Sequence, residues 1–253
     1  MLSICVTVKN RSHQKTEHGL IKLFPECIRS LDNCLSLEDD VELIITDWES
    51  DDYPIRDWIE SCVRDIPIHL ITIKGEGFSK GKGQNIAAEH ANGNILFFLD
   101  TDIILNQRVL NYGLSIPLGE SYYPTIKYQT EPHGSYNLVN HEGGGIFFIH
   151  KRDFEKTGGF PEFFRYGFED TEMVKRVGKV APILVKDDIA LFHQWHPQGM
   201  EFKDKYGTKE IEPEYNKTKN DCINAMKKLE EETKWIVRSM INDPNVQHPT
   251  RRR

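Results

Sequence analysis

The stretch Ile95–Leu105 constrains the fold of this chain more than any other. Its five leading apolar residues run directly into Asp100-Thr101-Asp102, and three more apolar residues follow. A continuous apolar run is typical of a strand that is buried on both faces of a sheet. Buried carboxylates are costly unless they are paired or bind a metal ion. At the end of such a strand the two aspartates can share one divalent cation; the alternative is that they cap a turn.

Strand and helix patterns alternate from the first residue to Leu105. The expected strands are Ser3–Val8, Val41–Thr46, Ile68–Ile73 and the run Ile95–Leu105, and the expected helices run from near Pro25 to Leu35, from Pro54 through Val63 and over Gln84–Ala91. This order predicts an α/β fold with a mainly parallel sheet and helices on both faces. Ligands bind such sheets at the carboxyl ends of the strands. Asn10, Arg11, Asp47 and the aspartate pair should therefore converge on one crevice.

The pattern changes after residue 105. The later expected elements are strands at Tyr122–Lys127 and Gly145–Ile149 with a polar loop Gln129–Asn140 between them, helices at Lys151–Lys156 and Glu169–Val177, short strands at Ile183–Val185 and Ala190–Phe192, and a long amphipathic helix at Asn216–Ile241. Acidic residues open the helix at Glu169, which suits the positive end of its dipole.

Composition excludes several classes of protein. The 253 residues carry a formal net charge of −7, which argues against a general nucleic-acid binder. No run approaches the roughly 18 apolar residues of a membrane span, and the first residues lack the basic start of a signal peptide. Five scattered cysteines, with no Cys-x-x-Cys pair, are typical of reduced thiols in a cytoplasmic protein.

Two histidines supply a possible completion of the aspartate site. His193 and His196 follow a short apolar run at a spacing of i, i+3. Carboxylate plus imidazole suits Mn²⁺ or a similar first-row ion, and leaves positions open for phosphate oxygens. For either histidine alone, the alternative is an ordinary core or surface residue.

Three further stretches have compositions that suit a sugar, a diphosphate or the close approach of a ligand. The segment from Gly158 to Asp170 is rich in glycine and aromatic residues and ends in two acids. Aromatic faces pack against sugar rings, and a carboxylate beside a hydroxyl can remove its proton; alternatively Glu169 and Asp170 only cap a helix. Lys80 and Lys82 lie in a glycine-rich stretch that could meet a diphosphate, and Gly143–Gly145 leaves room for a ligand. A solvated loop and a structural turn are the respective alternatives.

These residues together resemble the inverting GT-A glycosyltransferases of the family 2 type, and within them the galactosyltransferase and chondroitin-polymerase branch. The resemblance rests on Val6–Arg11, Asp47–Asp51, Asn85, Leu99–Asp102 and Gly158–Asp170 with the histidine pair, and it covers Ser3–Pro197. It implies the GT-A fold, a single Rossmann-like sheet, with a nucleotide-binding half over residues 1–105 and an acceptor half over residues 106–215. Residues 216–253 would form a C-terminal helical extension and tail.

The resemblance also implies roles for individual residues. Asp102, with Asp100, would hold Mn²⁺ (or Mg²⁺) on the donor diphosphate. His196 matches the metal histidine of the galactosyltransferases, and His193 falls where that branch has a methionine ligand. The remaining implied roles are the general base (Asp170), acceptor contacts (Glu169, Phe168) and contacts to the nucleotide sugar (Asn10, Arg11, Asp47, Lys80, Lys82, Asn85, Asp100, Thr101, Gly144).

The implied reaction is the metal-dependent transfer, with inversion, of a hexose or N-acetylhexosamine from a nucleotide sugar to a hydroxyl of a glycan or glycoconjugate. By resemblance the nucleotide is UDP, and the setting is polysaccharide biosynthesis. One alternative is a nucleotidyltransferase, which the loop Lys9-Asn10-Arg11-Ser12 disfavours because it lacks a glycine-rich signature. Another is a non-catalytic carbohydrate-binding module, which the intact acids Asp100, Asp102 and Asp170 disfavour.

Overall fold

The computed structural model describes residues 1–36, 39–140, 144–162 and 169–197. They lie in the first of two units, Met1–Lys205. The predicted helix Asn216–Ile241 and the predicted domain boundary at residue 215 lie outside the described residues, as does Phe168.

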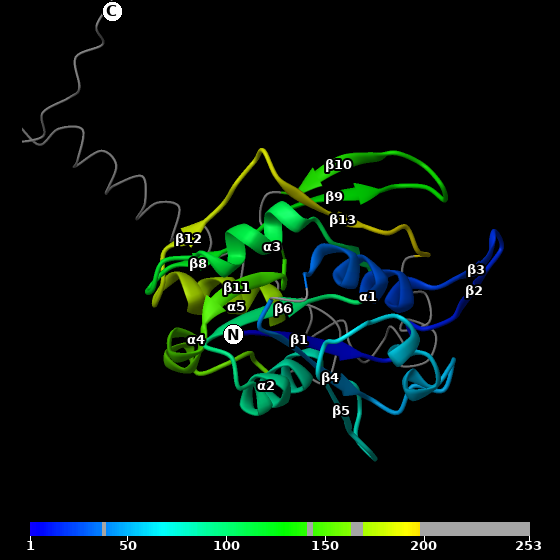
Figure 1. The fold of residues 1–253 in the computed structure, drawn as a ribbon, viewed down its shortest axis with the longest axis horizontal. Coiled ribbons are helices and arrows are strands. Elements are labelled where there is room, and N and C mark those ends of the chain that lie inside the picture. The colour runs from blue at the N-terminus through cyan, green and yellow to red at the C-terminus, as the bar shows by residue number, and fades with distance from the viewer. Residues whose placement is uncertain (37–38, 141–143, 163–168, 198–253) are drawn as a thin grey trace, which may run out of the picture. The chain divides into compact units, whose positions relative to one another are not determined.

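A seven-stranded sheet forms the centre of the described region (Figure 1). Its strands in spatial order are β12 (Ile183–Leu184), β8 (Ser121–Tyr122), β11 (Phe147–His150), β6 (Ile95–Leu99), β1 (Leu2–Val8), β4 (Val41–Asp47) and β5 (Ile68–Thr72). The four strands from β6 to β5 are parallel neighbours, whereas β11 runs antiparallel to both β6 and β8. The prediction of a mainly parallel sheet is confirmed, so the carboxyl ends of β1, β4 and β6 meet at one edge.

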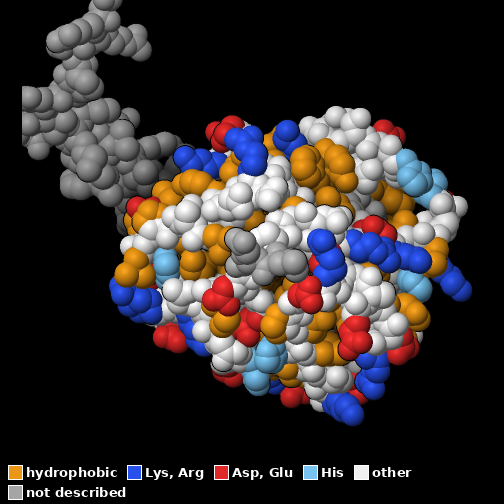
Figure 2. Space-filling view, viewed as in Figure 1, with side chains coloured by type: hydrophobic (Ala, Val, Ile, Leu, Met, Phe, Trp, Pro, Cys, Tyr) orange, Lys and Arg blue, Asp and Glu red, His pale blue; other side chains and the backbone are white. Residues whose placement is uncertain are grey.

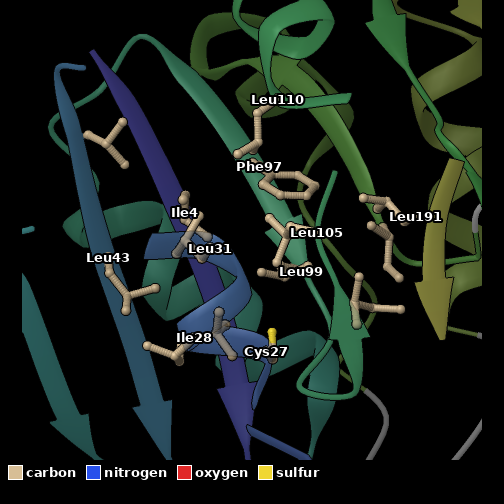
Figure 3. Packing of buried hydrophobic residues seen from close by; sticks show 14 of the residues in the cluster. Ile4, Cys27, Ile28, Leu31, Leu43, Phe97, Leu99, Leu105, Leu110 and Leu191 are labelled. Atoms are coloured by element: carbon tan, nitrogen blue, oxygen red, sulfur yellow. The ribbon is translucent and has the colours of Figure 1, made fainter. Parts of the chain in front are cut away.

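Helices cover both faces of this sheet, as predicted. One face packs against α1 (Leu23–Cys34) and α3 (Gln107–Leu114), and the other packs against α2 (Lys80–His90), α4 (Lys151–Thr157) and α5 (Glu169–Gly178). Successive side chains of a strand point to opposite faces, so Ile4 belongs to the first core and Cys5 to the second. Figure 3 shows Ile28 and Leu31 of α1 near Ile4 of β1 in the first core.

A second sheet begins where the central strand β6 ends. Its strands in spatial order are β10 (Tyr136–Asn140), β9 (Thr125–Gln129), β13 (Ala190–His193) and β7 (Ile103–Ile104). The chain passes from β6 to β7 through Asp100-Thr101-Asp102 alone. The aspartate pair therefore lies at the junction of the two sheets, and the predicted single run Ile95–Leu105 is two strands rather than one.

The start of α2 differs from the prediction. The glycines between Lys80 and Gln84 indicated a loop, but the helix already begins at Lys80, after the N-cap residue Ser79. A Cβ atom on Gly83 would lie 2.5 Å from the side chain of Thr7. Glycine at this position therefore lets α2 pack closely against the sheet.

Three other predictions also need correction. The segment from Pro54 to Val63 forms two short 3₁₀ turns, η1 (Ile55–Asp57) and η2 (Ile59–Ser61), in place of an α-helix. The predicted strand Tyr122–Lys127 divides between β8 and β9, and the second half of the predicted loop Gln129–Asn140 is β10. The sequence patterns did not indicate α3 or the hairpin formed by β2 (Gln14–Thr16) and β3 (Gly19–Ile21).

The cysteines in the described residues, Cys5, Cys27, Cys34 and Cys62, are free thiols, and Cys222 lies outside that part. Burial raises the pKa of the Cys5 and Cys27 thiols, which keeps them protonated. None of the described helices has the length and apolar character needed to cross a membrane. On the face drawn in Figure 2, acidic and basic side chains are interspersed among hydrophobic ones.

Candidate active site

The structure brings the two predicted histidines to the aspartate pair. His193 is the last residue of β13 and pairs with Ile103 of β7, directly after Asp102. The backbone N–H of Gln194 donates a hydrogen bond of 2.8 Å to the carbonyl oxygen of Asp102. Backbone pairing between β13 and β7 therefore fixes the position of the histidine segment beside the junction of the sheets.

Asp102, His193 and His196 form a group with the composition of a metal site. The Nε2 atom of His193 lies 3.6 Å from Asp102 Oδ1, and that of His196 lies 3.3 Å from Asp102 Oδ2. One ligand atom from each of the three residues can be chosen so that all lie within 4.8 Å of one another. Such separations suit three ligands around a single first-row ion.

The surroundings of these ligand atoms also fit a cation. Within the described residues, Asp102 Oδ1 is buried and accepts no hydrogen bond, which is costly unless a cation compensates it. Burial alone would raise the pKa of Asp102, but a hydrogen bond from His196 and the positive charges of His193, His196 and Arg11 lower it well below its usual range.

Neighbouring groups orient both imidazole rings. Tyr128 of β9 stacks on the His193 ring, with the ring centroids 4.6 Å apart. The Nδ1 atom of His196 lies 3.0 Å from the carbonyl oxygen of Pro197. With a proton on Nδ1 donated to this oxygen, Nε2 could bind a metal ion once it releases the proton that it donates to Asp102. Tyr128 was not predicted as a site residue, and in the sequence it is only one aromatic residue in a strand.

Lys80 links the first aspartate of the pair to the predicted base. Its Nζ atom lies 2.8 Å from Asp100 Oδ1 and 3.2 Å from Asp170 Oδ2. Lys80 opens α2 and Asp170 lies in the first turn of α5, so the amino-terminal ends of two helices meet here. Segments that are far apart in the sequence therefore place Asp170 next to the aspartate pair.

Gly145 provides the space in which this cluster sits. A Cβ atom on Gly145 would lie 2.1 Å from Asp170 Oδ1 and 2.9 Å from Lys80 Nζ. The sequence suggested that the run Gly143–Gly145 makes room for a ligand, but Gly145 makes room for Asp170. The neighbouring Gly144 has a φ of 57° and open space where a Cβ would be.

The charges in the cluster influence one another strongly. Burial would lower the pKa of Lys80, but Asp100, Asp170 and Glu169 raise it well above its usual value. Burial raises the pKa of Asp100, and Lys80 opposes that shift while Asp170 and Asp102 add to it. Burial and the charge of Asp170 raise the pKa of Glu169 to about 7. Lys80 therefore stays charged, and its charge offsets part of the repulsion among the acids.

Asn10 and Asp47 join the loops that follow β1 and β4. Asn10 has a φ of 52°; its N–H donates to Ser50 Oγ (2.9 Å) and its Oδ1 accepts from the N–H of Asp51 (2.9 Å). Asp47 Oδ1 accepts a hydrogen bond from the N–H of Ser50 (3.0 Å). Both predicted nucleotide contacts thus shape this edge of the sheet, and Arg11, beside Asn10, lies close enough for its charge to act on Asp102.

The remaining predicted site residues are placed as follows. Lys82 forms an ion pair with Glu76, and its N–H donates to the N-cap Ser79. Thr101 is buried between the two aspartates. Asn85 binds the backbone of Phe160 rather than any residue of the aspartate cluster.

Two family models match this sequence. The model for glycosyl transferase family 2 matches residues 3–114, and the model for the N-terminal domain of galactosyltransferase matches residues 128–181. Together they cover both the aspartate pair and the segment that contains Asp170. No curated protein matches the sequence significantly.

Several solved structures have a similar fold. The structure of S. aureus TarS 1–349 in complex with UDP-GlcNAc has a TM-score of 0.61 at 15% identity, covering 78% of this chain and 59% of that one. The mannosyltransferase PcManGT from Pyrobaculum calidifontis, in complex with GDP-Man and Mn²⁺, has a TM-score of 0.53 at 20% identity, covering 78% and 58%. This chain therefore spans about three fifths of the length of these two solved chains.

Proposed function

We propose that this chain is a GT-A glycosyltransferase of the family 2 type. In this proposal it transfers a hexose or N-acetylhexosamine from a nucleotide sugar, UDP first among the candidates, to a hydroxyl group of a glycan or glycoconjugate. The transfer proceeds with inversion and requires a divalent cation. Residues 1–105 bind the nucleotide, and residues 106–215 bind the acceptor.

One observation carries most of this proposal. A carboxylate from the middle of the chain and two imidazoles from nearly one hundred residues later lie within reach of one cation, at the carboxyl edge of the parallel strands. This edge is where α/β sheets bind their ligands. One similar structure is a complex with UDP-GlcNAc and another is a complex with GDP-Man and Mn²⁺, which supports a nucleotide sugar and Mn²⁺ as ligands here.

Asp102, His193 and His196 are the residues that would hold the cation, with Asp100 beside them. A bound Mn²⁺ or Mg²⁺ supplies positive charge that stabilises the leaving nucleoside diphosphate. Lys80 and Arg11 add positive charge beside the aspartate pair. Such charges stabilise the transition state most effectively when they are already in place before the bond between the sugar and the diphosphate breaks.

Asp170 acts as the general base. Its carboxylate accepts the proton of the acceptor hydroxyl while that oxygen attacks the anomeric carbon from the face opposite the leaving diphosphate. A single displacement of this kind inverts the configuration and needs no covalent enzyme intermediate. Asp170 lies on the first turn of α5, so the helix holds the base rigidly, while Glu169 and Phe168 contact the acceptor.

A screen of nucleotide sugars tests the proposal. The chain is incubated with UDP and GDP sugars, with and without Mn²⁺ and a sugar acceptor, and the release of nucleoside diphosphate is measured. We expect release from at least one donor, loss of release after chelation, and recovery with Mn²⁺. Release of pyrophosphate would instead indicate nucleotidyl transfer, and full activity after exhaustive chelation would contradict the metal requirement.

A further inference from the structure

Asn85 binds the backbone of the segment that leads toward Asp170. Its Oδ1 atom accepts a hydrogen bond from the N–H of Phe160 (2.8 Å), and its Nδ2 atom donates to the carbonyl oxygen of Phe160 (3.0 Å). The Nδ2 atom also donates to Glu162 Oε1 (3.0 Å). An amide side chain has two donors and one acceptor oxygen, so both donors and the oxygen are already used within the protein.

The glycines of this segment allow the amide of Asn85 to approach. Gly158 and Gly159 both have a φ of 77°, a conformation that other residues rarely adopt. A Cβ atom on Gly159 would lie 2.7 Å from Asn85 Oδ1, and one on Gly81 would lie 2.1 Å from the carbonyl oxygen of Pro161. The segment and α2 are therefore in close contact at two glycine positions.

The same segment is also attached to α5 and to the second core. Arg176 of α5 donates a hydrogen bond of 2.8 Å from Nη1 to the carbonyl oxygen of Gly159. The Phe160 ring is 2% exposed and packs edge-on against Phe98, with the centroids 5.0 Å apart. The position of the segment thus depends on α2, on α5 and on the core between them.

Helix α2 therefore contacts the region of the base in two places. Lys80, in its first turn, pairs with Asp170 itself. Asn85, further along the helix, holds the segment that precedes α5. Because Arg176 of α5 is hydrogen-bonded to Gly159, a shift of that segment relative to α2 would move α5 and, with it, the carboxylate of Asp170.

We propose that Asn85 is a positioning residue for the general base and not a ligand of the donor diphosphate. Its amide fixes the Gly158–Glu162 segment against α2 and thereby fixes the distance of Asp170 from the aspartate pair. This inference rests on the proposed function, in which Asp170 accepts the acceptor proton. It assigns to Asn85 a role different from the donor contact that the family resemblance implies.

The substitution Asn85→Asp tests the inference because it preserves size and the acceptor for the Phe160 N–H but removes both donated hydrogen bonds. We expect kcat at saturating donor to fall at least about tenfold, because a displacement of roughly 1 Å at a reacting group costs on the order of 100-fold. The Kd of UDP in the presence of Mn²⁺, measured by calorimetry, should change by less than about twofold.

A second-site variant separates positioning from general damage. Glu162 faces the Asn85 amide from the exposed side of the segment. In Asn85→Asp, two carboxylates would face each other, and adding Glu162→Gln restores a donor between them. We expect the double variant to recover part of the lost kcat. We expect Glu162→Gln alone to keep activity within about threefold of wild type. The effects of the two substitutions are then non-additive, as expected for residues in direct contact.

Other results would overturn the inference. A tenfold rise in the Kd of UDP with unchanged kcat in Asn85→Asp would make Asn85 a donor ligand, and unchanged kcat and Kd would leave it without a role in the reaction. If Asn85→Asp does not fold, Asn85→Ser takes its place with the same expected division between kcat and Kd.

A wild-type chain that transfers no sugar refutes the proposed function, and the inference with it. Transfer by wild type combined with weakened UDP binding in the variant refutes the inference alone.

Discussion

Replacing Lys80 with methionine removes the positive charge between two acids while keeping a side chain of similar length. Lys80 Nζ lies 2.8 Å from Asp100 Oδ1 and 3.2 Å from Asp170 Oδ2, and the exposed fractions of the three side chains are 17%, 31% and 29%. In Lys80→Met the two carboxylates keep their desolvation cost and lose the charge that offsets it. The variant should therefore be less stable whenever both acids are ionised.

The expected loss can be estimated from the burial of the pair. Removing one partner of a fully buried ion pair costs about 3–5 kcal/mol. Because these side chains remain partly exposed, solvent screens some of that cost, and we expect a loss of roughly 2–3 kcal/mol near pH 8. For a chain of this size such a loss lowers Tm by about 4–12 °C.

The loss should depend on pH with a definite sign. Lys80 opposes the upward shift of the Asp100 pKa, so without Lys80 this pKa rises further and the folded variant takes up a proton that the unfolded chain lacks at the same pH. The stability gained from that proton is present at low pH and is lost as the pH rises through the folded pKa of Asp100. The difference between wild type and Lys80→Met should therefore be smaller near pH 5 than near pH 8.

Urea unfolding in the presence of a chelator, followed by tryptophan fluorescence at the two pH values, measures this difference. Lys82→Met is the matched control, because Lys82 lies on the same helix and pairs with Glu76, a more exposed acid. Exposed pairs contribute about 0–1 kcal/mol, so the control should lose little at either pH. Equal losses in the two variants, or a loss in Lys80→Met that does not change with pH, would refute the reasoning.

Three further predictions concern the cation, the base and the acid beside it. His196→Ala should weaken Mn²⁺ binding at least about tenfold in calorimetry, whereas His90→Ala on the exposed side of α2 should leave it unchanged; equal effects would argue against the ligand role. Asp170→Asn should lower kcat by about 10²–10⁴-fold with nucleotide-sugar affinity preserved, and a loss of affinity in place of kcat would contradict the base assignment. Burial and the charge of Asp170 raise the pKa of Glu169 from 4.5 to about 7, so the stability from its bound proton is lost as the pH rises through 7. Glu169→Gln should therefore be more stable than wild type near pH 8, by on the order of 1–3 kcal/mol, and nearly neutral near pH 5 in urea unfolding; a pH-independent difference would oppose this.

The parallel half of the sheet could be predicted because each of its strands is indicated by the pattern of residues within that strand. β6 is a continuous apolar run, β1 and β4 are mostly apolar, and all three strands are buried along their whole length, as is typical of the inner strands of a parallel sheet. Polar residues directly after these strands marked the edge at which the site lies. The glycines before Gln84 misled the prediction, because glycine marks both flexible loops and close packing, and here Gly81 and Gly83 serve packing inside α2.

The geometry of the site depended on contacts that no local pattern contains. The juxtaposition of Asp102 with His193 and His196 was expected from residue chemistry and from the family resemblance. Nothing in the sequence indicated that Lys80 would bridge two acids or that Asn85 would bind the backbone of Phe160. Each of these contacts joins residues at least twenty positions apart, so only the folded chain reveals them.

The close approach at Gly145 has a consequence for comparing this enzyme with its homologues. A methyl group at this position would overlap the carboxylate of Asp170. In a related chain, a bulkier residue at the equivalent position would therefore indicate that the carboxylate proposed here as the general base has been displaced or that activity has been lost, even when the aspartate itself is retained. A glycine at this position could thus help to separate active from inactive related chains during genome annotation.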